Sequence, residues 1–256
     1  MSRSNKYRYK ILQYKSDTPK PRKNEIVIIP QDNRLMEIPP YLNQNTLPSW
    51  WASLPKSKGS LRRCQGTYDY LNYGFTIPLW TDVHIRPGFN GKENDYMLAQ
   101  FGEERIFRIE GFNESQATGC PFGSQAKNQQ SGYPKLVSPW RYFTPKGVSL
   151  LALPILHEPN PNYIVMPGMV HTDFYNQIHI VLKILSNEEF IIKAGTPIQH
   201  MIPVKRNENI KRIIWGNDSM YKFHKGQGMG KGCLQVDDNS HLYRKIQREI
   251  DQELEI

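Results

Sequence analysis

A histidine and an aspartate two residues apart, in the triplet His171-Thr172-Asp173, are side chains whose types and spacing could do chemistry. Imidazole and carboxylate groups both bind transition metals, and a third ligand would complete a site with open positions. His200 is the candidate third ligand. The sequence thus offers His171, Asp173 and His200 as candidate metal ligands, while two polar histidines in a pocket without metal are the simpler interpretation, which we favour.

The His-x-Asp form also resembles the facial triad of iron and 2-oxoglutarate oxygenases. That resemblance implies an oxygenase as one alternative function. His200 lies closer downstream than that family's usual spacing, and no following arginine is well placed for the co-substrate. Isolated triplets of this form occur by chance, so we rank this alternative low.

A second candidate for ligand binding is the glycine-rich stretch 226–232, which lies between Lys225 and Lys231. Exposed backbone amides and two ammonium groups can hold phosphates. Such glycine strings are more commonly flexible linkers, and we favour that interpretation. The three cysteines lie too far apart for a paired metal site, which favours neither a zinc ribbon nor a disulfide framework and indicates a reducing compartment.

These residues must be positioned by strands, because 19 prolines and 18 glycines divide the chain into short apolar runs. Such runs are typical of mainly β domains. Period-two alternation places Ile178, Ile180, Leu182 and Ile184 on one face of a strand. We expect strands at 25–30, 75–85, 148–153, 163–166, 177–184, 190–192 and 198–204, and we expect residues 135–206 to form one antiparallel barrel or sandwich.

Three helices are predicted. The first, 49–54, starts at a capping Ser49 and contains paired tryptophans that we expect to cover a core. The second, 67–73, is followed by Gly74, a left-handed cap. The third helix, 240–256, has Leu242, Ile246, Ile250 and Leu254 at a spacing of four. Its charges oppose the helix dipole, which predicts a packing partner, such as another chain.

The chain divides into a basic arm (1–23), a β domain (24–206) with an inserted polar loop (111–133), a glycine-rich linker (207–239) and the last helix. The arm holds eight cations and one acid, a net charge of +7 out of +9. It could contact nucleic acid or an acidic protein without sequence preference. A solvated leader is the interpretation we favour. We expect no membrane span and no secretory signal, because no apolar run approaches the roughly 20 residues needed.

Two segments, 168–176 (GMVHTDFYN) and 195–202 (GTPIQHMI), resemble the core motifs of the trimeric dUTP pyrophosphatase and dCTP deaminase superfamily. That family reads Gly-apolar-Ile-Asp-x-Asp-Tyr-Arg-Gly, then a strand, then Gly-Asp-Arg-Ile-Ala-Gln-Leu-Ile. The resemblance implies a β-clip barrel and a homotrimer that completes its sites between subunits. The segment 77–80 (IPLW) and the turn 195–199 also resemble a protein family of tailed phages and bacteria.

The resemblance to the pyrophosphatases implies a degenerate site. The water-activating aspartate of the family falls on His171, its sugar-stacking tyrosine on Phe174, and its phosphate-contacting glutamine on His200. The following arginine and glycine fall on Tyr175 and Asn176, and no Ser-rich phosphate motif lies between Trp140 and Val165. In an active homologue, His171 and Asp173 would be the catalytic residues, Mg²⁺ the cofactor, and Phe174, His200, Lys225 and Lys231 the ligand-binding residues.

The favoured function is therefore a non-enzymatic binding or virion-associated protein of phage type, because the general base and the phosphate motif are lost together. The alternative is an active dUTP or dCTP hydrolase or deaminase in which His171 serves as the base. Either function places the protein in the host cytoplasm or the phage particle. We also expect a homo-oligomer, with a trimer favoured.

Overall fold

The computed structural model describes residues 19–44, 46–57, 60–87, 96–100, 109–110 and 134–223. Residues 1–18 of the basic arm, the polar loop 111–133, Lys225, Lys231 and the predicted helix 240–256 lie outside the described residues. Within them, no helix combines the length and hydrophobicity that crossing a bilayer would require.

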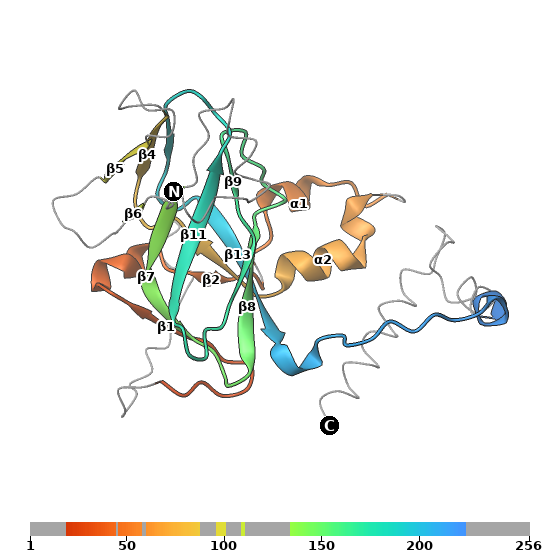
Figure 1. Ribbon diagram of the computed structural model, residues 1–256. Helices are drawn as coiled ribbons and strands as arrows, with labels where there is room; N and C mark the ends of the chain where they lie inside the picture. Colours follow the sequence, from red (N-terminus) through yellow and green to blue (C-terminus); the bar gives the residue numbers. More distant parts are fainter. Residues whose placement is uncertain are drawn as a thin grey trace.

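The chain is mainly β, as predicted, and its strands form antiparallel sheets (Figure 1). The first sheet has the order β1 (Val27–Pro30), β7 (Lys135–Phe143), β11 (Gln177–Ile184) and β9 (Tyr163–Val165), with β6 (Ile109–Glu110) also paired to β7. The second has the order β10 (Gly168–Val170), β8 (Val148–Pro154), β13 (Pro197–Lys205), β3 (Phe75–Pro78) and β2 (Tyr41–Leu42). The third contains β12 (Phe190–Ile192), β4 (Val83–Pro87) and β5 (Tyr96–Gln100).

From β7 to β11, successive strands alternate between the first and second sheets. The prediction of antiparallel strands over 135–206 is confirmed, and no helix interrupts 140–204. The tight turns, however, connect strands of different sheets, so β7 pairs with β11 and β8 pairs with β13. Hydrogen bonding among the described strands gives three sheets and no closed barrel.

The predicted single strand at 75–85 is divided into β3 and β4, which lie in different sheets. Leu79 leaves the ladder by exchanging backbone hydrogen bonds with the turn 194–197, where its N–H donates to Thr196 O at 2.8 Å and its carbonyl accepts from Gly195 N at 2.7 Å. Asp82 then accepts the backbone N–H of Ala194 at 2.8 Å. These contacts bend the chain between the two strands.

The core lies between the sheets and uses the predicted face of β11. Ile178, Ile180, Leu182 and Ile184 are all buried, and the residues between them are partly exposed. Trp140 and Tyr142 of β7 fill the same core, where the Tyr142 hydroxyl lies 3.0 Å from Ser138 Oγ. The alternation therefore identified the buried face correctly.

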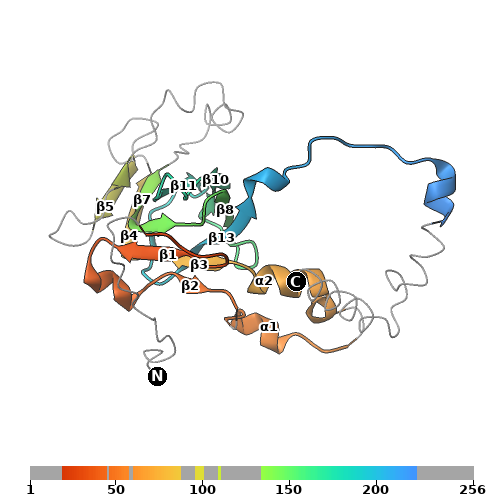
Figure 2. The same ribbon diagram turned by 90° about the horizontal axis from the view of Figure 1, so that it is seen from below.

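Besides a helical segment at 218–223, the described residues form two short helices, which lie beside the sheets (Figures 1 and 2). They are α1 (Ser49–Ser53) and α2 (Gln65–Asn72). The described residues also form 3₁₀ turns at η1 (Asn33–Glu37), η2 (Leu61–Arg63) and η4 (Arg206–Glu208). Ser49 does not cap α1, because the N-cap position is occupied by Pro48, whose side chain accepts no hydrogen bond. Trp51 is buried as predicted, whereas Trp50 is only half-buried.

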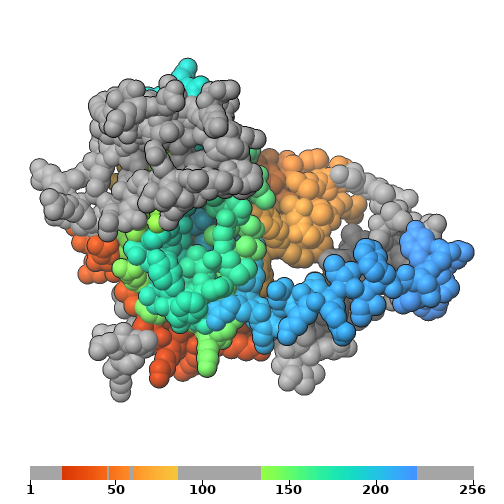
Figure 3. Space-filling view, viewed as in Figure 1, coloured from red at the N-terminus to blue at the C-terminus, as the bar shows by residue number. Residues whose placement is uncertain are grey.

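Gly74 follows Tyr73, the C-cap residue of α2, and has φ of +72°, the left-handed conformation predicted there. A Cβ there would lie 2.0 Å from Met201 O on β13, so glycine is also required by the close approach of the two backbones. Beyond η4, residues 209–223 of the predicted linker run away from the sheets (Figures 1 and 3). Trp215 in this segment is 89% exposed.

Candidate functional site

The His171-Thr172-Asp173 triplet lies in the loop between β10 and β11. Two backbone amides, those of Phe174 and Tyr175, donate to His171 O at 3.2 and 2.9 Å, which folds the loop into a turn. The hydroxyls of Thr172 and Thr144 lie 2.8 Å apart, so the loop is also joined to the turn that connects β7 and β8. These hydrogen bonds fix the backbone from which the side chains of the loop project.

Asp173 forms an ion pair with Arg206, which directly follows β13. Arg206 Nη1 and Nη2 donate to the two carboxylate oxygens at 2.7 and 2.6 Å, and the backbone N–H of Gly147 donates to Oδ2 at 2.9 Å. The Asp173 side chain is 8% exposed. The Arg206 hydrogen bonds, assisted by the Gly147 amide, lower the pKa of Asp173 to about 2. The carboxylate is thus ionised and occupied by three N–H donors.

Ser149 connects this ion pair to His171. Arg206 Nη1 donates to Ser149 Oγ at 3.0 Å, and Ser149 Oγ lies 2.7 Å from His171 Nδ1. A guanidinium can only donate, so the serine hydroxyl accepts from Arg206 and has its own hydrogen left for His171. We assign neutral His171 to the tautomer with its proton on Nε2 on the basis of this donor inventory. The free imidazole nitrogen is then a donor.

An exposed aromatic ring lies beside these polar groups. Phe174 is 70% exposed, its ring centroid is 5.7 Å from that of His171, and Arg206 Cζ is 5.9 Å from the Phe174 centroid. Apolar rings on which another planar group can stack, next to N–H donors, suit ligands that carry both a base and a phosphate. We call Ser149, His171, Asp173, Phe174 and Arg206 the His171 cluster.

His200 does not join the His171 cluster within one chain. On β13 it lies opposite Leu153, whereas Val204 lies opposite Ser149, so the two positions are four residues apart along β8. Four residues of strand span about 13 Å. Among the described residues, no group of three histidine, cysteine or acidic side chains is arranged to hold a metal ion. One chain therefore does not bring the three candidate metal ligands, His171, Asp173 and His200, together.

His200, which is fully buried, lies instead in a cluster with three half-buried side chains: Trp50 of α1, Tyr70 of α2 and His157. Its ring centroid is 4.8 Å from that of Tyr70, and the ring of His157 lies 6.2 Å from Trp50 and 6.4 Å from Tyr70. His200 Nε2 donates to Tyr73 O at 2.6 Å, which leaves Nδ1 as an acceptor. We call these four residues the His200 cluster.

Each member of the His200 cluster has a buried polar atom with no hydrogen-bond partner among the described residues: Trp50 Nε1, Tyr70 Oη, His157 Nδ1 and His200 Nδ1. Burial lowers the pKa of His200, although the Tyr73 carbonyl opposes this, and burial together with the charge of His200 lowers the pKa of His157. Both imidazoles are therefore neutral at pH 7.

Sequence reasoning identified His171, Asp173 and Phe174 and missed Ser149, Arg206 and His157. Ser149 had a readable signal, since it is a hydroxyl at a fully buried position of an otherwise apolar strand. Arg206 directly follows the apolar run of β13, but nothing in the sequence relates it to Asp173, 33 residues earlier. Nothing in the sequence relates His157 to Trp50 of α1 and Tyr70 of α2, which lie beside it in the fold.

No family model matches the sequence, and no curated protein matches it either. The function is therefore argued from the residues and their geometry.

Proposed function

We propose that this protein is a non-enzymatic binding protein of phage type, built as a variant of the dUTP pyrophosphatase-like barrel. The engagement of Asp173 carries the proposal, because its two oxygens already accept three N–H groups. A carboxylate held in this way, with a pKa of about 2, is a poor base and has little capacity left for a magnesium ion. The antiparallel strands over 135–206, which no helix interrupts, support a mainly β fold, although their hydrogen bonds close no barrel among the described strands.

His171, at the position of the family's water-activating aspartate, is engaged as well. Its Nδ1 lies 2.7 Å from Ser149 Oγ, and in the assigned tautomer Nε2 carries the proton and would donate to a ligand. The exposed Phe174 ring offers a stacking face next to that donor. The proposed role is to hold a planar, anionic ligand such as a nucleotide without converting it, in a homotrimer that works in the host cytoplasm or within a phage particle.

Turnover and binding assays on the purified full chain test this function. With dUTP or dCTP and Mg²⁺, we expect release of pyrophosphate or ammonia near background, because the base and the phosphate donors are missing together. We expect dUMP or dCMP binding, measured by calorimetry, to be weakened by Phe174→Ala and to persist in Tyr68→Ala on α2. Turnover faster than about one per second would establish the hydrolase alternative instead.

A further inference from the structure

The His171 cluster lies at one end of the sheets, where four segments meet. The turn 144–147, the loop 171–176 and Arg206 are joined there, since the Arg206 amide donates to Gly147 O at 3.0 Å and the Gly147 amide donates to Asp173. Residues 19–25 reach the same end, because Val27 of β1 pairs with Phe143 and the chain before it continues past that turn. We call this surface the Phe174 end.

Positive charge is concentrated on the Phe174 end. Eight cations lie in these segments and in the stretch 205–212 around Arg206, against three acids: Lys20, Arg22, Lys23, Lys146, Lys205, Arg206, Lys211 and Arg212, against Glu25, Asp173 and Glu208. Two acids are neutralised locally, Asp173 by Arg206 and Glu208 by Lys205 at 2.7 Å. Lys146 and Arg212 are exposed and form no ion pair with the described residues. They are available to an anionic partner.

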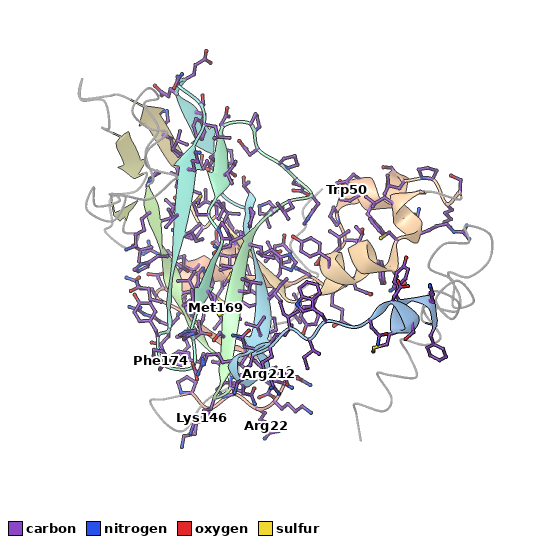
Figure 4. All side chains as sticks on the ribbon, turned by 45° about the vertical axis from the view of Figure 1, so that its right-hand side comes forward. Arg22, Trp50, Lys146, Met169, Phe174 and Arg212 are labelled. Carbon is purple, nitrogen blue, oxygen red and sulfur yellow. The ribbon has the colours of Figure 1, made fainter. Side chains whose placement is uncertain are left out.

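Exposed apolar side chains lie among these cations. Phe174 is 70%, Met169 53% and Tyr175 49% exposed. Figure 4 shows Phe174, Lys146, Arg22 and Arg212 at the same end of the molecule, with Met169 farther up the sheet and Trp50 beside the helices. A solvent-exposed ring surrounded by cations is the combination that single-stranded nucleic acids use, because bases stack on the ring while cations contact phosphates.

We propose that the Phe174 end binds single-stranded nucleic acid, with a base stacked on Phe174 and the backbone phosphates near Lys146 and Arg212. The inference deepens the proposed function and rests on it in one respect, namely that the ligand is held and not converted. The His171 Nε2–H would donate to a phosphate or base oxygen beside the ring.

The sequence before Pro19 supports a nucleic-acid partner over a single nucleotide. It contains one acid, Asp17, and five cations: Arg3, Lys6, Arg8, Lys10 and Lys15. One nucleotide would occupy only the Phe174 ring and its neighbours, whereas a strand can use cations on both sides of it. Contacts through stacking and phosphates predict little sequence preference.

The first measurement is fluorescence anisotropy of a labelled 20-nucleotide strand with the full chain at 50 and 200 mM salt. We expect Phe174→Ala to weaken binding about tenfold, since one base loses its stacking surface. The double variant Lys146→Gln/Arg212→Gln should also weaken binding and lower the salt slope by about 1.4, at roughly 0.7 for each phosphate that is no longer neutralised. All three side chains are exposed, so the fold should persist, which circular dichroism checks.

Matched controls lie on the helices and the loop between them. Tyr68→Ala removes another exposed ring and Lys56→Gln another exposed cation, and both should bind as the unchanged protein does. A duplex of the same sequence should bind more weakly, because its bases are not available to stack. Poly-glutamate should compete poorly at equal charge.

Three outcomes would overturn the inference: unchanged affinity in Phe174→Ala, equal affinity for duplex and single strand, or equal competition by poly-glutamate. The last would indicate an acidic protein as the partner. Since these measurements contain no turnover step, their failure would leave the non-enzymatic function standing. Rapid dUTP turnover would refute that function whatever the strand does.

Discussion

His171 lies beside the start of β8, and His200, on β13, lies opposite the end of β8. The two histidines differ in burial and in hydrogen bonding. His171 is half-buried and its Nδ1 is hydrogen bonded to Ser149, within a network that also satisfies Asp173 and Arg206. His200 is fully buried and its Nδ1 has no partner among the described residues. The first histidine presents a donor to solvent, whereas the second packs the helices against the sheet.

The comparison shows that residue type and spacing do not determine a histidine's role. The motif resemblance places both residues in a site completed between subunits, whereas within one chain the register of β8 against β13 separates them. The polar network around His171 leaves that loop ready to hold a ligand. The His200 cluster stabilises through packing, at the cost of unpaired polar atoms, and its burial keeps two imidazoles neutral.

The largest expected effect distinguishes the two histidines by stability. His200→Ala removes a fully buried ring and the hydrogen bond to Tyr73 O, and we expect it to lower the free energy of unfolding by about 3 kcal/mol. Urea denaturation followed by circular dichroism measures this change. A loss under about 1 kcal/mol would show that the site collapses around the cavity and that the cluster is not a packing element.

The fold could be predicted from the sequence as far as local patterns reach. Alternation over 177–184 indicates the buried face of β11, and Gly74 indicates the end of α2. Pairing could not be predicted, because alternation says which face is buried and does not say which strand lies alongside. Asp82 shows this most clearly, since it bends the chain through a contact with Ala194, 112 residues away.

The candidate site divides in the same way. His171, Asp173 and Phe174 are close in sequence, so one motif brings all three together. Ser149 and Arg206 are 57 residues apart, and only the pairing of β8 with β13 makes them neighbours. His200 was assigned by resemblance to a site completed between subunits, and within one chain its neighbours are those of the His200 cluster. The sequence predicts local clusters, and sheet register decides which clusters combine.

A second, smaller effect tests the His171 cluster, whose polar groups are hydrogen bonded to one another. Asp173→Ala leaves the guanidinium of Arg206 and the amide of Gly147 without their acceptor, and we expect a loss of about 2 kcal/mol. Asp173→Asn should lose less, because its amide oxygen can still accept from Gly147. Equal losses in the two variants would contradict the assigned hydrogen bonds.

Acid dependence of the same carboxylate follows from its depressed pKa. Asp173 titrates near 2 in the folded chain and near 3.8 when unperturbed, so the unfolded chain binds more protons between these values. Its stabilisation is present above pH 3.8 and is lost as the pH falls toward 2. Urea midpoints measured between pH 5 and pH 2.5 should fall less steeply for Asp173→Asn than for the unchanged protein. Parallel slopes would argue against this linkage.

The His200 cluster should respond at milder pH. The pKa values of His157 and His200 lie below 6.5 in the fold, so stability is fully present above pH 6.5 and declines as the pH falls through the folded values. Thermal melting at pH 7.5 and 5.5 should show a lower midpoint at pH 5.5. His200→Phe keeps a ring without a proton site and should reduce that difference, while His171→Phe serves as the control and should keep it.

The smallest expected effect on stability is that of His171→Ala, about 1 kcal/mol or less. The substitution removes one hydrogen bond from a half-buried ring, and Ser149 keeps its bond from Arg206, so no charge is left unpaired. The same substitution should weaken nucleotide binding, because the Nε2–H donor beside Phe174 is lost. Nitrogen-15 NMR of the imidazole can verify the cause, since the assigned tautomer places the proton on Nε2. A proton on Nδ1 would make Ser149 an acceptor from both neighbours and leave Nε2 free as a base, which would favour the hydrolase alternative.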